Sequence, residues 1–152
     1  MKIIFVCTGN TCRSAMAEGI AREIFNREKL PIEVESRGVS VHIPLGASDN
    51  AILALKKQEI DISNHISKPI CAKDIEDADL ILTMTQSHRQ VLEGACREQN
   101  KPLYTLMEFT RQKEKEIEDP FGKDLTAYEV CAKEIMDCIK KIPSVLQQLN
   151  YL

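Results

Sequence analysis

Four segments of the chain have the hydrophobic pattern of β-strands. Residues 2–6 (KIIFV) are a short run rich in β-branched and aromatic side chains, and residues 32–36 (IEVES) alternate between apolar and polar. Residues 78–84 (ADLILTM) form a continuous apolar run, which is typical of a strand buried on both faces of a sheet. Residues 102–106 (PLYTL) complete the set. We predict a strand in each segment.

The segments between these strands carry apolar residues at the spacing of one face of an α-helix. This spacing predicts helices over residues 14–28, through Ile52 and Leu55, over residues 85–97, and from about residue 125 to 149. Ser14 is the expected N-cap of the first helix, and Thr126 with Glu129 matches a capping box for the last one. Pro143 interrupts the last apolar stripe and predicts a kink or a split there.

Strands that alternate with helices predict a single α/β domain over residues 1–152, with a four-stranded parallel, doubly wound sheet flanked by helices. The chain shows no internal repeat, linker or low-complexity tract. Ligands of such sheets bind beyond the carboxyl ends of the strands. We therefore expect the functional loop directly after the first strand.

The overall charge narrows the classes of partner. A formal net charge of -3 argues against a nucleic-acid or anionic-membrane partner. No apolar run approaches the roughly 18 residues of a membrane span, and the N-terminus runs directly into the first strand without the pattern of a signal peptide. We expect a cytoplasmic protein with reduced thiols. The charged segment 111–119 is most simply a solvated loop.

The six cysteines divide into three pairs. Cys131 and Cys138 lie seven residues apart on the last apolar stripe and are expected to pack in the core, and two others are isolated in the sequence. No second Cys/His pair stands near a first at the spacing of metal ligands, so we expect no metal and no cofactor. Cys7 and Cys12 remain, and both lie in the loop that follows the first strand.

This loop has the composition of a phosphate cradle. A turn from a strand end to a helix N-terminus directs backbone N–H groups inward and forms an anion nest. Gly9 and Asn10 tolerate positive φ, and the guanidinium of Arg13 can grip two oxygens of a phosphoryl group. The thiolate form of Cys7 is favoured by the backbone amides, by the helix dipole and by Arg13. Such a thiolate would be an in-line nucleophile below a bound phosphate. The alternative without a binding function is that Cys7 is a buried thiol at the end of a strand and Arg13 is a surface residue of the helix.

Other phosphate-binding motifs are absent, since neither G-x-x-x-x-G-K-[ST] nor G-x-G-x-x-G occurs. Instead, the chain resembles the low-molecular-weight protein tyrosine phosphatase family over nearly its whole length. The segments that carry the resemblance are VCTGNTCRSAMAEG (6–19), ESRGV (35–39), ISNHISKPI (62–70), ADLILTM (78–84) and EDPFG (118–122). The resemblance implies a four-stranded parallel sheet and a covalent phosphocysteine mechanism.

The resemblance also implies roles for individual residues. Cys7 would be the nucleophile, Arg13 the phosphate clamp and Asp119 the general acid, while Ser14 would hydrogen-bond the thiolate. The phosphate-binding loop would comprise Thr8, Gly9, Asn10, Thr11, Cys12, Arg13 and Ser14. From the residues alone, Asp119 cannot be separated from Glu116, Glu118 or Asp124.

In the family, an Asn, a Ser and a His form a network that shapes the loop. The matching positions are Asn10, Ser36 and His65. His88 gains no role from the resemblance. Arg37 stands where the family typically has a small residue near the pocket mouth, so we expect it to alter the rim.

The substrate is predicted to be a phosphorylated protein, with phosphate or another oxyanion held in the loop. Bacterial protein-arginine phosphatases resemble the sequence most through CTGNTCRS and DPFG, which favours phosphoarginine. Thr11, Ser40 and Phe121 are the expected selectivity residues, although Ser40 stands where arginine-directed relatives carry a larger apolar side chain. The alternative within the family is phosphotyrosine. Arsenate reduction and non-catalytic phosphate binding are less favoured.

Cys12 is the expected redox partner of Cys7. A thiolate is readily oxidised to sulfenic acid, and a neighbouring thiol can capture it as a disulfide before further oxidation. Cys12 follows Cys7 by five residues in a loop that curls around its ligand, which places a disulfide within reach. The alternative is that Cys12 only packs.

Overall fold

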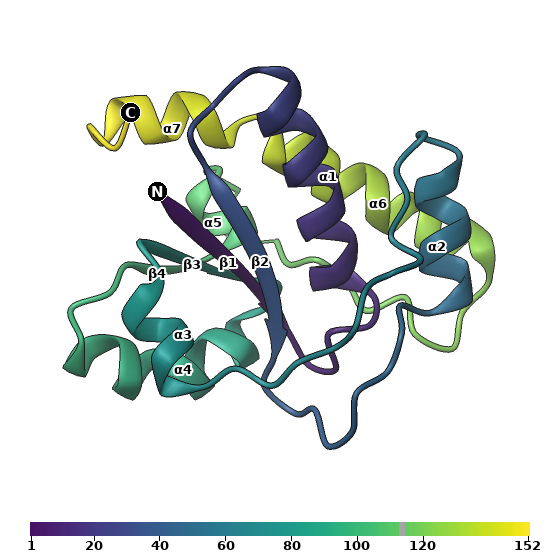
Figure 1. The fold of residues 1–152 in the computed structure, drawn as a ribbon, viewed down its shortest axis with the longest axis horizontal. Helices are drawn as coiled ribbons and strands as arrows, with labels where there is room; N and C mark the ends of the chain where they lie inside the picture. Colours follow the sequence, from purple (N-terminus) through teal and green to yellow (C-terminus); the bar gives the residue numbers. More distant parts are fainter. Residues whose placement is uncertain (113–114) are drawn as a thin grey trace.

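The computed structural model describes residues 1–112 and 115–152. Its strands form one four-stranded sheet in the order β2-β1-β3-β4, with each neighbouring pair parallel (Figure 1). The strands are β1 (Lys2–Cys7), β2 (Glu33–Gly38), β3 (Leu80–Thr83) and β4 (Leu103–Thr105). The predicted single-domain α/β fold with a parallel four-stranded sheet is confirmed.

The sheet separates two apolar cores because successive side chains of a strand point to opposite faces. In β1, Ile3 and Phe5 pack in one core, whereas Ile4 and Val6 pack in the other. The first core is covered by α1 (Arg13–Arg27), α2 (Asp49–Lys56), α6 (Leu125–Ile139) and α7 (Ile142–Gln148). The second is covered by α3 (Ala72–Asp77) and α4 (Gln86–Glu98), below the sheet in Figure 1. Helices on both faces explain why residues 3–7 of β1 and 80–82 of β3 are a continuous buried apolar run.

Two short helices were not predicted from the pattern. In α3 only Ile75 is buried, and in α5 (Leu106–Phe109) the helix is a single turn directly after β4. Segments this short contain no repeated apolar face. Side chains stabilise their ends instead, since the Thr105 hydroxyl accepts the backbone N–H of Glu108 at the start of α5.

Two predicted helix caps were wrong. Helix α1 begins at Arg13 with Cys12 as its N-cap, because Ser14 is buried and its hydroxyl is directed toward the loop. Helix α6 is capped by Asp124, whose carboxylate accepts the backbone N–H of Ala127 at 3.0 Å, while Thr126 lies within the helix. The split at Pro143 is confirmed, since α6 ends at Ile139 and α7 begins at Ile142 with the proline in its first turn.

The charged segment before α6 is not simply a solvated loop. Two of its residues, 113 and 114, lie outside the described residues. Ile117, however, is fully buried, and its N–H donates to the carbonyl of Met84 at 3.1 Å. The segment is therefore attached to the end of β3, and this attachment places Asp119 at the same edge of the sheet.

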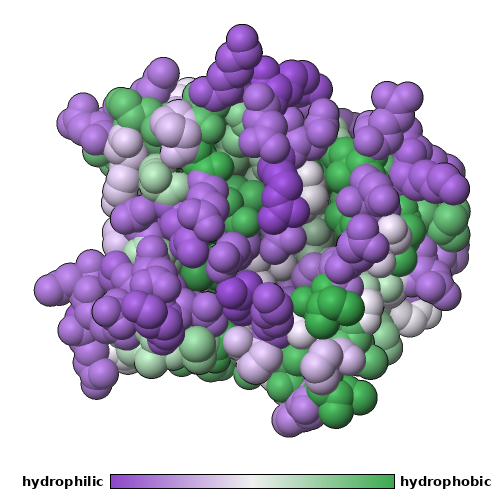
Figure 2. All heavy atoms as spheres, in the orientation of Figure 1, coloured by the Kyte–Doolittle hydropathy of each residue, from purple (hydrophilic) through white to green (hydrophobic). Residues whose placement is uncertain are grey.

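The surface is mostly hydrophilic in the view of Figure 2. Hydrophobic side chains gather at its lower edge, where the loop after β2 runs in Figure 1, and in that loop the exposed fractions of Ile43 and Leu45 are 63% and 51%. Within residues 1–112 and 115–152, the structure holds no helix with the length and apolarity to cross a membrane.

Candidate active site

The loop between β1 and α1 surrounds a small pocket at the carboxyl end of the sheet. The pocket has a volume of about 210 Å³ and is lined by Cys7, Thr8, Gly9, Thr11, Cys12, Arg13, Asp119 and Phe121. The loop is continuous with the sheet, because the N–H groups of Val39 and Ser40 donate to the carbonyls of Cys7 and Thr8, both at 2.9 Å. The site therefore lies where parallel α/β sheets bind ligands.

Cys7 is the last residue of β1 and is only 3% exposed. Its Sγ lies 2.8 Å from the Oγ of Ser14, in the first turn of α1. The sulfur thus faces a hydroxyl and the amino end of a fifteen-residue helix. Both groups stabilise negative charge.

Asn10 determines the shape of the loop. It adopts a φ of 57° and is fully buried, and its amide nitrogen donates to the hydroxyls of Ser14 at 2.8 Å and Ser36 at 2.9 Å. Its side-chain oxygen accepts the N–H of Lys68 at 3.0 Å. The backbone carbonyl of Asn10 accepts from His65 Nε2 at 2.6 Å. The three positions implied by the family network therefore lie together.

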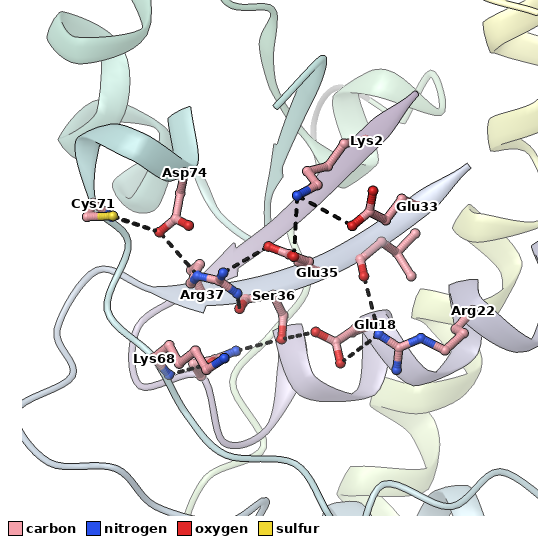
Figure 3. Close-up of polar contacts among 12 residues, drawn as sticks. Lys2, Glu18, Arg22, Glu33, Glu35, Ser36, Arg37, Lys68, Cys71 and Asp74 are labelled. Atoms are coloured by element: carbon pink, nitrogen blue, oxygen red, sulfur yellow. Dashed lines mark hydrogen bonds and ion pairs between the residues drawn. The ribbon is translucent and has the colours of Figure 1, made fainter. Parts of the chain in front are cut away.

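The network continues outward from β2 to α1. The hydroxyl of Ser36 donates to Glu18 at 3.0 Å, and Glu18 in turn pairs with Arg22 at 3.4 Å (Figure 3). Because a hydroxyl carries one hydrogen, this bond turns the Ser36 oxygen lone pairs toward Asn10. Glu18 thus acts on the loop through two intervening side chains.

The expectation for Arg37 was wrong. Its guanidinium pairs with Glu35 at 2.8 Å and with Asp74 at 3.1 Å (Figure 3). These contacts tie the side chain to β2 and α3, and Arg37 is not among the residues that line the pocket. The pocket rim is therefore formed without it.

Two glycines at the loop have different roles. Gly9 does not adopt a positive φ; Asn10 alone does so within the loop. Gly38, at the end of β2, is required for close approach, since a Cβ there would lie 2.6 Å from the carbonyl oxygen of Thr8 and 3.1 Å from the Cβ of Asn10. The loop packs directly on the backbone of β2.

Arg13 joins the loop to the segment that carries Asp119. One terminal nitrogen donates to the carbonyl of Ile117 at 3.1 Å, and the other lies 3.5 Å from Asp119 Oδ2. The Arg13 side chain is 6% exposed and that of Asp119 is 52% exposed. Asp119 Oδ1 accepts the N–H of Phe121 at 3.0 Å, so both oxygens have a partner.

The position of Asp119 separates it from the neighbouring acids. Among the four acidic candidates, Asp119 alone lines the pocket. Glu118 pairs with Lys123 at 3.2 Å, Glu116 accepts from the N–H of Gln86, and Asp124 caps α6. The geometry thus leaves one carboxylate beside Cys7.

The three predicted selectivity residues differ in location. Thr11 and Phe121 line the pocket, and the exposed fraction of Phe121 is 74%. Ser40 lies beside the loop through its N–H, but its hydroxyl is directed toward His42 at 3.4 Å and it does not line the pocket. Their influence on substrate choice stays a prediction.

Cys12 contacts partners that the sequence did not indicate. Its Sγ lies 3.4 Å from the hydroxyl of Ser48 and 3.5 Å from that of Tyr128, on α6. Burial raises the pKa of Tyr128 to about 12, and its hydrogen bond with Cys12 acts in the same direction. Cys7 and Cys12 are both free thiols, so a disulfide between them stays a prediction.

His88 is a further residue that sequence reasoning missed. Its Nε2 lies 2.8 Å from the Oγ1 of Thr8, across 80 positions of sequence. Burial and the nearby Arg13 guanidinium lower the pKa of His88 to about 4, against the opposing effect of Asp119. No local signal marks this contact, because His88 lies on a helix that is distant from the loop in sequence.

The arrangement combines a buried sulfur, a fixed cation and one carboxylic acid around a small cavity. Such a set can bind a tetrahedral anion, attack it and protonate a leaving group. Within the described parts of the chain, no three His, Cys, Asp or Glu side chains are grouped to hold a metal ion.

Comparisons with known proteins agree with this chemistry. Residues 2–150 match the family described as low molecular weight phosphotyrosine protein phosphatase. The chain is 35% identical over 148 residues to the protein-arginine-phosphatase of Bacillus subtilis, covering 97% of this chain and 98% of that protein. It is 36% identical over 146 residues to the low molecular weight protein-tyrosine-phosphatase PtpB of Staphylococcus epidermidis, covering 93% and 96%. A solved structure of the YwlE arginine phosphatase, a cysteine-to-serine mutant with a phosphorylated active-site serine, has a TM-score of 0.89 at 36% identity, covering 97% of this chain and 96% of that one.

Proposed function

The chain belongs to the low molecular weight phosphotyrosine protein phosphatase family, and from this premise we propose that it hydrolyses phosphoarginine in proteins through a phosphocysteine at Cys7. The observation that carries the proposal is the pocket beside Cys7, which is walled by Thr11 and Asp119. A hydroxyl and a carboxylate there suit a guanidinium, which presents several N–H donors.

In the first step, the Cys7 thiolate attacks the phosphorus atom in line with the bond to the arginine nitrogen. The S–P bond forms and the P–N bond breaks, with its electron pair passing to the nitrogen. Asp119 transfers its proton to that nitrogen, so that arginine leaves with a protonated guanidinium and Asp119 becomes a carboxylate. Arg13 and the loop amides hold the phosphoryl oxygens, where charge spreads in the transition state.

In the second step, a water molecule attacks the phosphocysteine. The new O–P bond forms as the S–P bond breaks, and the electron pair returns to Cys7 as thiolate. Asp119, now a carboxylate, accepts the proton of the water. Ser14, 2.8 Å from the sulfur, stabilises the thiolate as the leaving group. The phosphorylated active-site serine of the arginine phosphatase mutant supports a covalent intermediate at this position.

Two observations favour phosphoarginine. Thr11 presents a hydroxyl where an aliphatic side chain would leave guanidinium N–H groups without acceptors, and Asp119 supplies a second acceptor. The 35% identity to a protein-arginine-phosphatase along almost the whole chain points the same way.

The second candidate is phosphotyrosine, and one observation favours it. Phe121 lines the pocket mouth with most of its ring exposed, and an aromatic face there could pack on a phenyl ring. A relative of similar identity is a protein-tyrosine-phosphatase. The two substrates must therefore be compared directly.

Arsenate reduction has less support. A thiol relay needs further reactive cysteines near the loop, and the stretch after β3 has none before Cys96, which packs in the opposite core. Burial raises the pKa of Cys131 to about 12, which keeps that thiol protonated. A non-catalytic phosphate-binding module is disfavoured because the nucleophile and the acid face the same pocket.

The test is kcat/KM on matched peptides that carry phosphoarginine or phosphotyrosine at the same position. We expect wild type to prefer phosphoarginine. The Thr11→Ile variant should lose phosphoarginine turnover while sparing or raising phosphotyrosine turnover, and Thr11→Ser, which keeps the hydroxyl, is the matched control. A wild-type preference for phosphotyrosine, or an unchanged ratio in Thr11→Ile, would overturn the substrate assignment. No turnover of either peptide would overturn the phosphatase assignment.

A further inference from the structure

The contact between His88 and Thr8 links a buried side chain to the pocket wall. His88 is 5% exposed and lies in the first turn of α4, whereas Thr8 is exposed and lines the pocket directly after Cys7. Their 2.8 Å contact is the one hydrogen bond of the Thr8 hydroxyl within residues 1–112 and 115–152. The direction of that bond determines what Thr8 can offer to a ligand.

The groups around the imidazole determine which of the two side chains donates in the hydrogen bond between His88 and Thr8. Two groups of Thr85 lie near His88 Nδ1: the hydroxyl at 3.1 Å, which can donate or accept, and the backbone N–H at 3.2 Å, which can only donate and points at the nitrogen. Nδ1 is therefore an acceptor without a hydrogen. Burial and Arg13 keep the ring neutral by lowering the pKa of His88 to about 4. The single ring hydrogen must then lie on Nε2, which donates to the Thr8 oxygen.

A hydroxyl oxygen that accepts from His88 keeps its own hydrogen free for another partner. No described side chain or carbonyl accepts it. Because Thr8 borders the same cavity as Cys7 and Arg13, an anion in that cavity is a suitable acceptor. The imidazole thus converts a rotating hydroxyl into an oriented donor.

We propose that His88 is a positioning residue that orients the Thr8 hydroxyl as a hydrogen-bond donor to an oxygen of the phosphate group bound in the pocket. The inference rests on the proposed phosphatase function only in that the pocket binds phosphate. It adds a side-chain donor to the backbone amides and Arg13. It is independent of whether arginine or tyrosine carries the phosphate.

The first part of the proposal, that His88 donates to Thr8 through Nε2, is tested by nitrogen NMR of the imidazole in the unmodified protein. Long-range ¹⁵N–¹H spectra at pH 7, with His88→Gln to assign the signal, should show a neutral ring with its hydrogen on Nε2. Addition of inorganic phosphate should leave that tautomer unchanged. A hydrogen on Nδ1, or a charged ring, would overturn the proposal, because Thr8 would then not be held as described.

The second part of the proposal, that the Thr8 hydroxyl donates to phosphate, is tested by phosphate binding to matched variants. Thr8→Val removes the hydroxyl at constant shape, and Thr8→Ser retains it. His88→Asn keeps an acceptor for the N–H of Thr85 but is too short to reach Thr8, whereas His88→Gln can still donate to it. Ser87→Ala, on the exposed side of the same turn, is the control.

We expect the Kd for inorganic phosphate, measured by calorimetry, to rise about tenfold in Thr8→Val and in His88→Asn, which is the loss typical of one hydrogen bond to a charged group. Thr8→Ser and His88→Gln should bind nearly as wild type does. The Thr8→Val/His88→Asn double variant should be no weaker than either single variant, because both changes remove the same bond.

Each outcome decides the proposal. Unchanged phosphate affinity in Thr8→Val would refute the donor role. Additive losses in the double variant, with a lowered unfolding temperature in His88→Asn, would show that His88 only supports α4. A reversed preference between phosphoarginine and phosphotyrosine peptides in wild type would contradict the substrate assignment and leave these phosphate affinities unaffected, so the two failures are distinguishable.

Discussion

Two regions that meet at the pocket are held in very different ways. The phosphate loop, residues 7–14, is built into the sheet. Cys7 is 3% exposed and Asn10 is fully buried, and Asn10 is hydrogen-bonded to the Ser36 hydroxyl, the His65 ring and the backbone N–H of Lys68. The acid segment, residues 115–121, is attached mainly through Ile117 and its contacts with Arg13, and the Asp119 side chain is 52% exposed.

The difference shows how the site divides its tasks. The groups that we propose to bind and attack the phosphate are preorganised by buried hydrogen bonds, so they need little rearrangement when a ligand binds. The proposed acid, Asp119, is half-exposed at the pocket, where it can reach the leaving group of the substrate, and it lies on a less buried segment. Changes in the loop should therefore affect all substrates alike, and changes in the acid segment should depend on the leaving group.

The largest effect is expected from Cys7→Ser. Turnover of every phosphorylated substrate should be abolished, because a serine hydroxyl in this loop is a far weaker nucleophile than a thiolate. Phosphate binding should persist, since backbone amides and Arg13 form most of the cradle. In wild type, rapid quenching with substrate and mass spectrometry should detect a phosphocysteine at residue 7. Full activity in Cys7→Ser would contradict the mechanism.

Asp119→Ala should have the next largest effect and should distinguish the two regions. We expect kcat to fall by about 10²–10⁴-fold, the usual contribution of a general acid. The loss should shrink for aryl phosphates whose leaving groups need little protonation. Glu118→Ala, which removes the exposed neighbour that pairs with Lys123, is the control and should change kcat little. Equal losses for good and poor leaving groups would show that Asp119 has another role.

Asn10→Ala should destabilise the loop and lower the activity on all substrates by the same factor. The change removes buried hydrogen bonds to Ser14, Ser36 and Lys68, which should lower the free energy of unfolding by about 2–4 kcal/mol. Activity on good and poor leaving groups should fall by the same factor, unlike that of Asp119→Ala. Urea unfolding and steady-state kinetics measure both effects, with the exposed Asn26→Ala as control. A loss that depends on the leaving group would contradict the division of tasks.

His88 provides a smaller, pH-dependent test, because it contacts the loop at Thr8 and its pKa responds to Asp119. Burial lowers the pKa of His88 from 6.5 to about 4 in the folded protein. Between these values the unfolded chain binds a proton that the folded chain does not, so stability should be full above about pH 6.5 and decrease as the pH falls toward 4, by up to about 3 kcal/mol.

Urea unfolding at pH 7 and pH 4.5 should show this loss in wild type, and a smaller one in His88→Gln. Because the charge of Asp119 raises the pKa of His88, Asp119→Asn should shift the NMR titration of His88 to still lower pH. An unchanged titration would mean that the acid segment does not lie close to the loop in solution.

The local parts of this architecture could be read from the sequence. The strands, the longer helices and the phosphate loop follow from hydrophobic spacing and from residues 7–14, because a strand, a tight turn and a helix start are encoded by neighbouring residues. Short helices such as α3 and α5 could not be read in this way, since one or two turns contain too few positions to show a period.

The sequence by itself thus determined the fold class, and it predicted the anion cradle and a candidate nucleophile, Cys7, within it. The tertiary structure alone decided which carboxylate faces Cys7, that Arg37 turns away from the pocket, and that His88 touches Thr8. The physical reason is separation along the chain, since Asp119 contacts Arg13 across 106 positions and His88 contacts Thr8 across 80. Such contacts depend on how the sheet and the helices pack, and a local sequence pattern does not predict that packing.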